Sequence, residues 1–304
     1  TVNEVALRLN NRSGQGERGA FINTSVGSLS PGESTNVTFD STIPDNKIIN
    51  PLPRAGNHTI DILVGIDSSA PTSAEGFATS TAEVDYGSIQ CGVRAADQNE
   101  RVAVAAERYT EPVSVDKHGV RIVGEPGATI DTGGNSAFSL NASATAVTRM
   151  NITGSGAAGV VMTNYADKAI VAQNTLSGFA TAVEVRGDDS EVIANRITVD
   201  GMDSVLNLSG ASNVVVAQNR LTPSRGSDDP ASAGIVLESS PGVLISDNTI
   251  AVRQENADSG DQPAILIRDN ASLNGTALRN NLDAETAAGT PIVASGGVSP
   301  VDVE

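Results

Sequence analysis

The chain has 304 residues, enough for two domains, and its charge is strongly unbalanced. Asp and Glu number 36 against 19 Lys and Arg, which gives a formal net charge of −17 at pH 7. This charge argues against nucleic acid and anionic membranes as partners, because both would be repelled. The single cysteine, Cys91, excludes an internal disulfide, and we expect it to be buried.

Lysine is rare and arginine carries most of the positive charge. The three lysines are Lys47, Lys117 and Lys168. A surface rich in Asp and Glu but poor in Lys stays hydrated at high salt, where repulsion between its charges is screened. The composition resembles that of haloarchaeal proteins; the alternative is an ordinary acidic surface protein. No stretch is apolar enough to span a membrane, and no signal peptide is present. Because the chain starts abruptly at Thr1, we expect a processed or incompletely represented precursor.

Residues 1–87 are predicted to form an immunoglobulin-like β-sandwich. Short alternating runs are separated by clusters of turn residues, which is typical of antiparallel strands. The runs lie at 4–9, 20–29, 35–39, 58–66 and 81–86. The strings VGSLSPGESTNVTF and AGNHTIDILVGID resemble the CARDB-type immunoglobulin-like module of archaeal and bacterial surface proteins.

Such a module normally begins one or two strands earlier than this segment does. The missing strands leave two interpretations. An open sandwich edge would accept a strand from another subunit and lead to polymerisation. Alternatively, the domain is truncated or slightly divergent, which we favour. Residues 1–87 and 88–304 are the two predicted domains.

An apolar signature repeats between about Phe138 and Val293. Its copies are short, with alternating apolar residues, so each copy is predicted to be a strand with two inward side chains. The predicted inward pairs are Phe138/Leu140, Val160/Met162, Val183/Val185, Leu206/Leu208, Ile235/Leu237 and Ile265/Ile267. A repeat of this length indicates a solenoid, because one coil cannot bury its own apolar face but stacked coils can.

A second signature is a strand that ends in Asn and a further apolar residue. The Asn positions are Asn174, Asn195, Asn219 and Asn248, and Met150 occupies the corresponding place upstream. We expect each Asn at a sharp corner, in left-handed conformation, with the stacked amides hydrogen-bonded as a ladder. These four residues are therefore interpreted as structural and not catalytic.

With both signatures, the chain resembles the right-handed parallel β-helix (pectin-lyase-like) superfamily over residues 88–304. Ile89, Val93 and Ala96 lie at helical spacing just before the first coils, as in the N-terminal cap of that superfamily. An end cap is needed because an uncovered coil exposes strand edges. The prediction is an all-β chain: an immunoglobulin-like sandwich followed by a right-handed β-helix. The resemblance implies a fold and no particular function.

Two widened repeats, 222–233 and 252–264, give the best candidate site. Both follow the Asn corner, so we expect their loops to stack on one side of the helix beside 199–204. The resulting patch contains Asp200, Asp203, Asp228, Asp229, Asp258, Asp261, Glu255, Arg225 and Arg253. Its carboxylates would bind Ca²⁺, which takes six to eight oxygens, or supply the acid and base of a glycoside hydrolase. The alternative, which we favour, is a set of solvated acidic loops without a cofactor.

No complete catalytic constellation is present. The tripeptide Gly187-Asp188-Asp189 resembles one element of the polygalacturonase signature, but the rest of that signature is missing. Both histidines, His58 and His118, lie upstream of it, and His118 is expected on the surface. No phosphate loop, Ser-His-Asp set or nucleotide fingerprint is found.

Asn-X-Ser/Thr sequons are more frequent than chance predicts, which favours an exported glycoprotein over an intracellular protein. They begin at Asn11, Asn23, Asn36, Asn57, Asn141, Asn151, Asn207, Asn270 and Asn274. Asn207 is flanked by two inward leucines and is expected to face outward and to be accessible.

The sequence therefore predicts a non-enzymatic, extracellular or cell-surface structural glycoprotein of a halophilic archaeon: a rigid spacer, an adhesin or a filament subunit. Its expected partners are other copies of itself or other surface proteins, and also glycans or a cell-surface receptor. One alternative is a receptor-binding spike or capsid decoration on the surface of a haloarchaeal virion. The other is a polysaccharide lyase or glycoside hydrolase.

Overall fold

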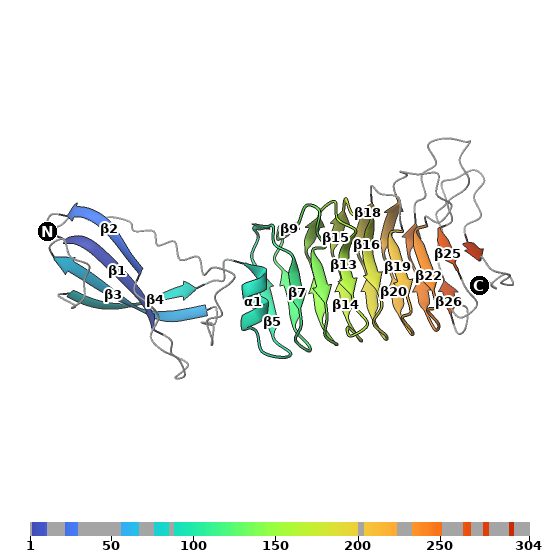
Figure 1. Cartoon of the computed structure of the whole chain (residues 1–304), viewed down its shortest axis with the longest axis horizontal. Helices are drawn as coiled ribbons and strands as arrows, with labels where there is room; N and C mark the ends of the chain where they lie inside the picture. Colours follow the sequence, from blue (N-terminus) through green and yellow to red (C-terminus); the bar gives the residue numbers. More distant parts are fainter. Residues whose placement is uncertain are drawn as a thin grey trace. The chain divides into compact units, whose positions relative to one another are not determined.

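The structure is a computed structural model of the whole chain (Figure 1). It describes four N-terminal strands by their backbone, and then residues 88–199, 204–223, 233–250, 264–268, 276–279 and 292–294. The chain divides into two compact units, Thr1–Gly87 and Ser88–Glu304.

The first unit contains a four-stranded antiparallel sheet. Its strands are β1 (Val2–Asn10), β2 (Ile22–Leu29), β3 (Gly56–Ile66) and β4 (Gly76–Val84). They are ordered β2-β1-β3-β4, and β1 pairs with β3 from Val2 to Asn10 with one irregularity near Val2. Four of the five predicted runs coincide with these strands; the run at 35–39 lies outside the described residues. The immunoglobulin-like sandwich and the CARDB resemblance stay predictions.

The second unit is a solenoid of three parallel sheets, which we call sheets I, II and III in the order in which each coil visits them. Sheet I contains β7 (Val113–Val115), β10 (Phe138–Leu140), β13 (Ala158–Met162), β16 (Thr181–Val185), β19 (Leu206–Ser209), β22 (Ile235–Glu238), β25 (Ile265–Ile267) and β27 (Ile292–Ala294). Sheet II contains β5 (Arg101–Val104), β8 (Arg121–Gly124), β11 (Ala146–Thr148), β14 (Ile170–Ala172), β17 (Glu191–Ile193), β20 (Val215–Ala217), β23 (Leu244–Ser246) and β26 (Ala277–Arg279). Sheet III contains β6 (Arg108–Tyr109), β9 (Thr129–Asp131), β12 (Asn151–Thr153), β15 (Thr175–Ser177), β18 (Arg196–Val199), β21 (Arg220–Pro223) and β24 (Thr249–Ile250).

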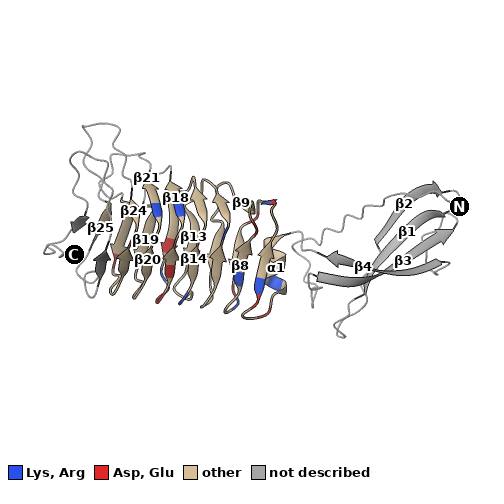
Figure 2. Ribbon diagram, turned by 180° about the vertical axis from the view of Figure 1, so that it is seen from behind, with Lys and Arg blue, Asp and Glu red and all other residues tan. Residues whose placement is uncertain are grey.

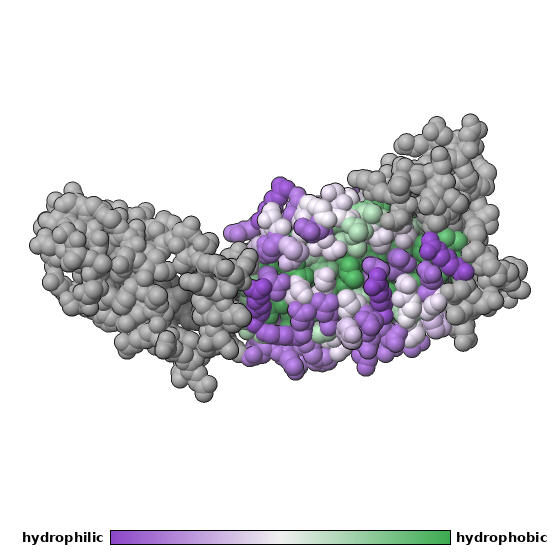
Figure 3. Space-filling model, in the orientation of Figure 1, coloured by the Kyte–Doolittle hydropathy of each residue, from purple (hydrophilic) through white to green (hydrophobic). Residues whose placement is uncertain are grey.

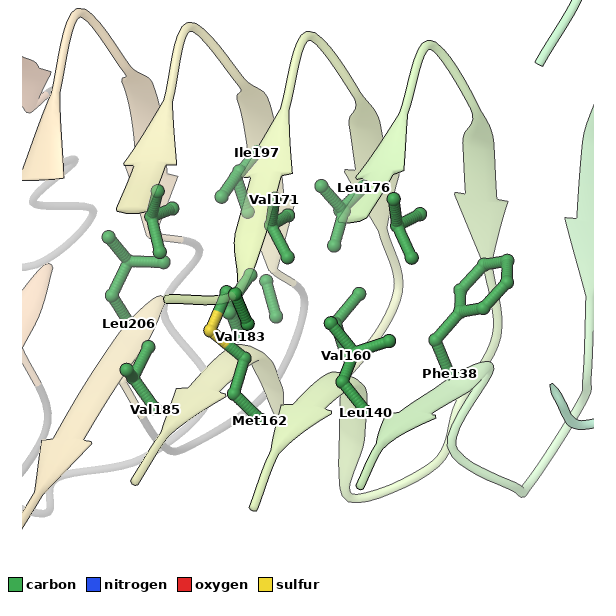
Figure 4. Close-up of a cluster of buried hydrophobic side chains, with 14 of the residues drawn as sticks. Phe138, Leu140, Val160, Met162, Val171, Leu176, Val183, Val185, Ile197 and Leu206 are labelled. Atoms are coloured by element: carbon green, nitrogen blue, oxygen red, sulfur yellow. The ribbon is translucent and has the colours of Figure 1, made fainter. Parts of the chain in front are cut away.

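The solenoid core is formed by one inward row or two from each sheet. All six predicted pairs of sheet I are fully buried, and their strands stack in the predicted register, as in Phe138 opposite Val160. Leu176 and Ile197 of sheet III and Val171 of sheet II point into the same interior (Figure 4). Because each outward side chain alternates with an inward one, this core fixes which residues face the solvent. The repeat was therefore correctly interpreted as a parallel β-helix.

A short helix, α1 (Ile89–Ala95), covers the N-terminal end of the core. It buries Ile89 and Val93, as predicted. The Gln90 side chain pairs with β7 at its backbone, accepting from the Ser114 N–H at 2.7 Å and donating to the Ser114 carbonyl at 3.2 Å. The cap thus satisfies backbone groups that an open sheet edge would expose. Cys91 lies in this helix, but it is only half-buried, so the prediction of a buried thiol was wrong. It is two residues from both Ile89 and Val93, which places it on the opposite side of the helix.

The corner between sheets II and III is held by a ladder of asparagine amides. The backbone N–H groups of Asn174, Asn195 and Asn219 each donate to the Oδ1 of the next Asn at 2.9 Å. Each Nδ2 donates to a carbonyl of an earlier coil, as Asn219 does to Val192 at 2.7 Å. The four side chains are only 1–2% exposed. Met150 ends the ladder, since it has no amide and only donates its N–H to Asn174 Oδ1.

We predicted that the Asn of each corner adopts the left-handed conformation, but the structure shows that the residue before it does so. Positive φ angles of 55–59° occur at Arg149, Gln173, Ala194, Gln218 and Asp247. The reversal is made one residue earlier, which leaves the Asn backbone free to pair and its side chain directed into the stack. The side chain, and not tolerance of positive φ, is therefore the reason for Asn at this position.

Candidate functional site

The predicted acidic patch lies outside the described residues. This applies to Asp200, Asp203, Asp228, Asp229, Asp258, Asp261, Glu255, Arg225 and Arg253. The structure does describe the strands from which these segments start and to which they return. The positions of these strands show which sheets the predicted segments connect.

The three segments connect neighbouring strands. They leave sheet III after β18, β21 and β24, which are adjacent in that sheet, and enter sheet I at β19, β22 and β25, which are also adjacent. All three segments enter sheet I, at strands that lie next to one another. The outer face of sheet I from β16 to β25 is therefore the described surface that we compare with the predicted patch. We treat this face as the candidate site.

Apolar residues lie along the middle of this face and hydrophilic residues on either side (Figure 3). One outward row runs from strand to strand as Val161, Glu184, Asn207, Val236 and Leu266. Val236 and Leu266 pack with Ala233 in a small apolar cluster outside the main core. These three side chains are only 2–6% exposed although they do not point into the solenoid.

The charged side chains on this face form ion pairs. Arg186 binds Glu184 two residues earlier, with Nε 3.0 Å from Oε1 and Nη2 also in contact. Arg268 Nη1 lies 3.5 Å from Glu238 Oε2 on the neighbouring strand. The side chains are 21–50% exposed, so each pair contributes at most about 1 kcal/mol.

Asn207 is the polar residue whose partners are incomplete. Its Oδ1 is buried and, within the described part of the chain, has no hydrogen-bond partner. Register places it between Glu184 and Val236. A buried acceptor without a donor costs about 1–3 kcal/mol. The Asn207 side chain is therefore held on this face at an energetic cost.

The Gly187-Asp188-Asp189 turn has a structural role. Asp188 Oδ1 accepts from the Ser212 N–H at 2.7 Å, and Asp167 Oδ1 accepts from the Asp188 N–H at 3.1 Å. Asp189 has a φ of 55° and accepts from Asn213 Nδ2 at 3.2 Å. These carboxylates satisfy the backbone and side chains of successive turns between sheets I and II. The polygalacturonase-like tripeptide is thus part of the turn stack.

The sequons differ in accessibility. Asn151 is exposed on the outer face of sheet III, while Asn141 and Asn207 are half-buried. Asn141 Nδ2 donates to Ser114 Oγ and to Asp116 Oδ1, both at 2.9 Å. Asn207 faces outward as predicted but is less accessible than expected. Asn23 and Asn57 lie in β2 and β3, described by backbone alone, and Asn11, Asn36, Asn270 and Asn274 lie outside the described residues.

The remaining candidates are isolated. His118 is exposed, as predicted, and its Nδ1 is 3.0 Å from Ser143 Oγ, whereas His58 lies in β3. Within the described ranges there is no group of three or more His, Cys, Asp or Glu side chains placed to hold a metal ion. The same ranges contain no helix with the length and hydropathy needed to cross a membrane.

Comparison with known proteins gives a family but no close relative. No curated protein matches the sequence. Among solved structures, a pectin methylesterase in complex with a hexasaccharide is 12% identical, with a TM-score of 0.49, over 69% of this chain and 76% of that one. Pectin methylesterase PemA from Erwinia chrysanthemi is 9% identical, with a TM-score of 0.42, over 69% and 89%.

The enzymatically active domain of bacteriophage CBA120 tailspike protein 2 is 10% identical, with a TM-score of 0.35, over 64% of this chain and 40% of that one. A family profile described as a right handed beta helix region matches residues 136–301. That range covers more than half of the chain and contains the strands of the three stacked parallel sheets from β10 to β27. The chain therefore belongs to the right-handed β-helix family.

Proposed function

We propose that this chain is a non-enzymatic structural protein, exported to an exterior surface of a halophilic archaeon, where it acts as a rigid spacer, an adhesin or a filament subunit. The observation that carries the proposal is the buried amide ladder. Its four backbone to side chain bonds of 2.9 Å link five successive coils, from the coil of Met150 to the coil of Asn248. Each coil is thus fixed to its neighbours at a corner as well as by its strands.

Rigidity follows from this construction. A coil that opens at the corner would expose buried amide and carbonyl groups, each of which costs about 1–3 kcal/mol when left unpaired. The sheet registers are continuous from β7 to β25 in sheet I, so no strand is free to shift alone. Such a solenoid suits a mechanical role.

The surface location is supported by composition. The net charge of −17 and the rarity of lysine suit high salt outside the cell, and the sequons suit an exported glycoprotein. Asn151 is the most accessible of the described sequons, and we propose it as a glycan acceptor. A virion surface would make the same physical demands and remains the alternative location.

A test of the structural role is to incubate the purified full chain with pectin, polygalacturonate and alginate at molar salt. We expect no release of methanol, of reducing ends or of unsaturated products above the rate without protein. Turnover that disappears in an Asp228→Asn/Asp229→Asn variant would establish an enzyme and overturn the proposal. A His118→Ala variant is the matched control, since this side chain is exposed and far along the chain from the loops.

A second candidate, a polysaccharide-active enzyme, is favoured by one observation. Within the described part of the chain, Asn207 Oδ1 is an unsatisfied acceptor on sheet I, the sheet that the chain enters after the widened connections. In that case Asn207→Leu would abolish turnover while leaving the melting temperature unchanged or raised. Should the acidic loops bind Ca²⁺ instead, chelator at constant ionic strength would lower the melting temperature of the unmodified chain and not that of the Asp228/Asp229 variant.

A further inference from the structure

The outer face of sheet II is unusually apolar for a protein with this charge. Two outward rows cross β8, β11, β14, β17, β20 and β23, and we call them together the aliphatic face. The first row is Arg121, Ala146, Ile170, Glu191, Val215 and Leu244. The second row is Val123, Thr148, Ala172, Ile193, Ala217 and Ser246. Figure 2 shows β14 and β20 without charged residues.

These aliphatic side chains are not part of the core. The core of sheet II is the row between them, which includes Val171, Val192 and Val216, all fully buried. Ile170, Ile193 and Val215 are instead partly exposed on the other side of the strands. A contiguous apolar patch on a soluble protein marks an interaction surface. Salt strengthens the tendency, because the charges that keep acidic molecules apart are screened at high ionic strength.

Two charged residues interrupt the aliphatic face, and they have opposite signs. Arg121 is exposed and Glu191 is half-buried between Ile170 and Val215. Within the described part of the chain neither side chain forms an ion pair. A partly buried carboxylate among aliphatic side chains is unfavourable unless a cation approaches it. The face thus lacks a positive group above Glu191.

The spacing of these charges is self-complementary. Arg121, Ala146, Ile170 and Glu191 occupy the same row on four successive strands. A two-fold axis placed between β11 and β14, parallel to the strands, brings Arg121 of one copy onto Glu191 of the other, twice. The same rotation sets the small Ala146 against the larger Ile170, and sets two β-branched side chains, Val123 and Ile193, against each other. A two-fold axis that runs along the first row, with the two solenoids parallel, would instead place Arg121 on Arg121 and Glu191 on Glu191.

We propose that two copies of this chain associate through their aliphatic faces, with the two solenoids antiparallel. Like other isologous contacts, this one is closed by its own symmetry and yields a dimer. The proposal deepens the structural role proposed above by naming the partner as a second copy. It is tested by molecular mass and not by turnover, so either proposal can fail without the other.

Other occupants are less well supported by the face. Nucleic acid or an anionic membrane would need a basic surface, but from β8 to β23 the two rows hold one cation, Arg121, with Arg101 and Arg279 on the strands at either end. Stacking platforms for sugars require aromatic rings, and these rows contain none. A copy of the same chain supplies both aliphatic side chains and the missing cation.

The test is sedimentation equilibrium of the full chain at molar salt. We expect a dimer for the unmodified protein and a dissociation constant at least about tenfold larger for Ile170→Glu, because a charge would be buried in the contact. Thr198→Glu, an outward substitution on sheet III, is the matched control and should leave the constant unchanged. Circular dichroism at the same salt concentration checks that each variant is folded.

A charge exchange decides the orientation. Arg121→Glu places two carboxylates together at both ends of the contact and should weaken the dimer by about tenfold or more. Adding Glu191→Arg in the same chain restores opposite charges and should recover the original constant. A monomeric unmodified chain at molar salt overturns the proposal, and so does a dimer that none of these substitutions weakens. If the double variant dimerises no more tightly than Arg121→Glu alone, the antiparallel arrangement is overturned.

Discussion

Sheets II and III are built on the same inward plan, yet their outer faces differ. The outward rows of sheet II are mainly aliphatic. The outward rows of sheet III carry Thr, Ser and Asn, with Arg196 and Arg220 side by side on β18 and β21, where Figure 2 shows blue. The core requires alternating apolar residues but places no demand on the outward positions. The residue types on the outer faces are therefore set by what the molecule contacts, and not by the requirements of its fold.

The largest expected effect is at the corner that joins the two sheets, where both depend on the same asparagine ladder. Asn219 Oδ1 accepts from the Asn195 N–H at 2.9 Å and its Nδ2 donates to the Val192 carbonyl. Replacing Asn219 with Ala would leave both backbone groups buried and unpaired, at about 1–3 kcal/mol each. We expect the free energy of unfolding, from guanidinium titration, to fall by about 2–6 kcal/mol.

The control for the ladder is Asn151→Ala on the outer face of sheet III. Its amide lies at 3.5 Å from Thr129 Oγ1 and is exposed, so the unfolding free energy should change by less than about 0.5 kcal/mol. An equal loss in both variants would mean that the amides do not hold the corner.

The inward rows offer a second test, because the two sheets should behave alike there. Ile245 of sheet II and Leu221 of sheet III are both fully buried. Each change to Ala removes core side chain and leaves a cavity, so we expect a loss of about 2–5 kcal/mol for either variant. The outward neighbours Leu244→Ala and Thr222→Ala should cost less than about 1 kcal/mol. If Leu244→Ala lowered the unfolding free energy of the monomer by much more than this, the outer face of sheet II would be packed within the monomer and not exposed.

The sequence predicted the solenoid because the inward positions repeat under a physical constraint. Phe138, Val160 and Val183 stack in register, and each must be apolar for the next coil to pack. The Asn positions were equally visible, since the ladder needs an amide in every coil. The residue that adopts the left-handed conformation was not, because Gln173 and Ala194 share no side-chain property.

The candidate site was harder to predict for the same reason. The widened connections could be located from the changed spacing, and their attachment to β19, β22 and β25 follows from the repeat. The unsatisfied Asn207 Oδ1 depends on the neighbours of one side chain and leaves no pattern in the sequence. The aliphatic face was in the sequence, at Ile170, Ile193 and Val215, but its residues resemble core residues until the strand alternation is fixed.

The smallest expected effect concerns the two arginines of sheet III. Arg196 and Arg220 are directly opposite on neighbouring parallel strands, both are exposed, and within the described part of the chain neither has an ion-pair partner. Like charges in this position repel. Because Thr175 and Thr249 occupy the same row on the flanking strands, Thr fits the site.

We therefore expect Arg196→Thr to raise the unfolding free energy at low salt by about 0.2–1 kcal/mol, and the gain to disappear at molar salt as the charges are screened. Urea titration measures the change at both salt concentrations, since urea adds no ions of its own. Arg186→Thr on sheet I is the matched control, because it removes an arginine that is paired with Glu184 and should lower the stability slightly or leave it unchanged. A loss of stability in Arg196→Thr at low salt would mean that the arginine pair contributes favourably to the face, and the contrast between the sheets would then extend to how each tolerates charge.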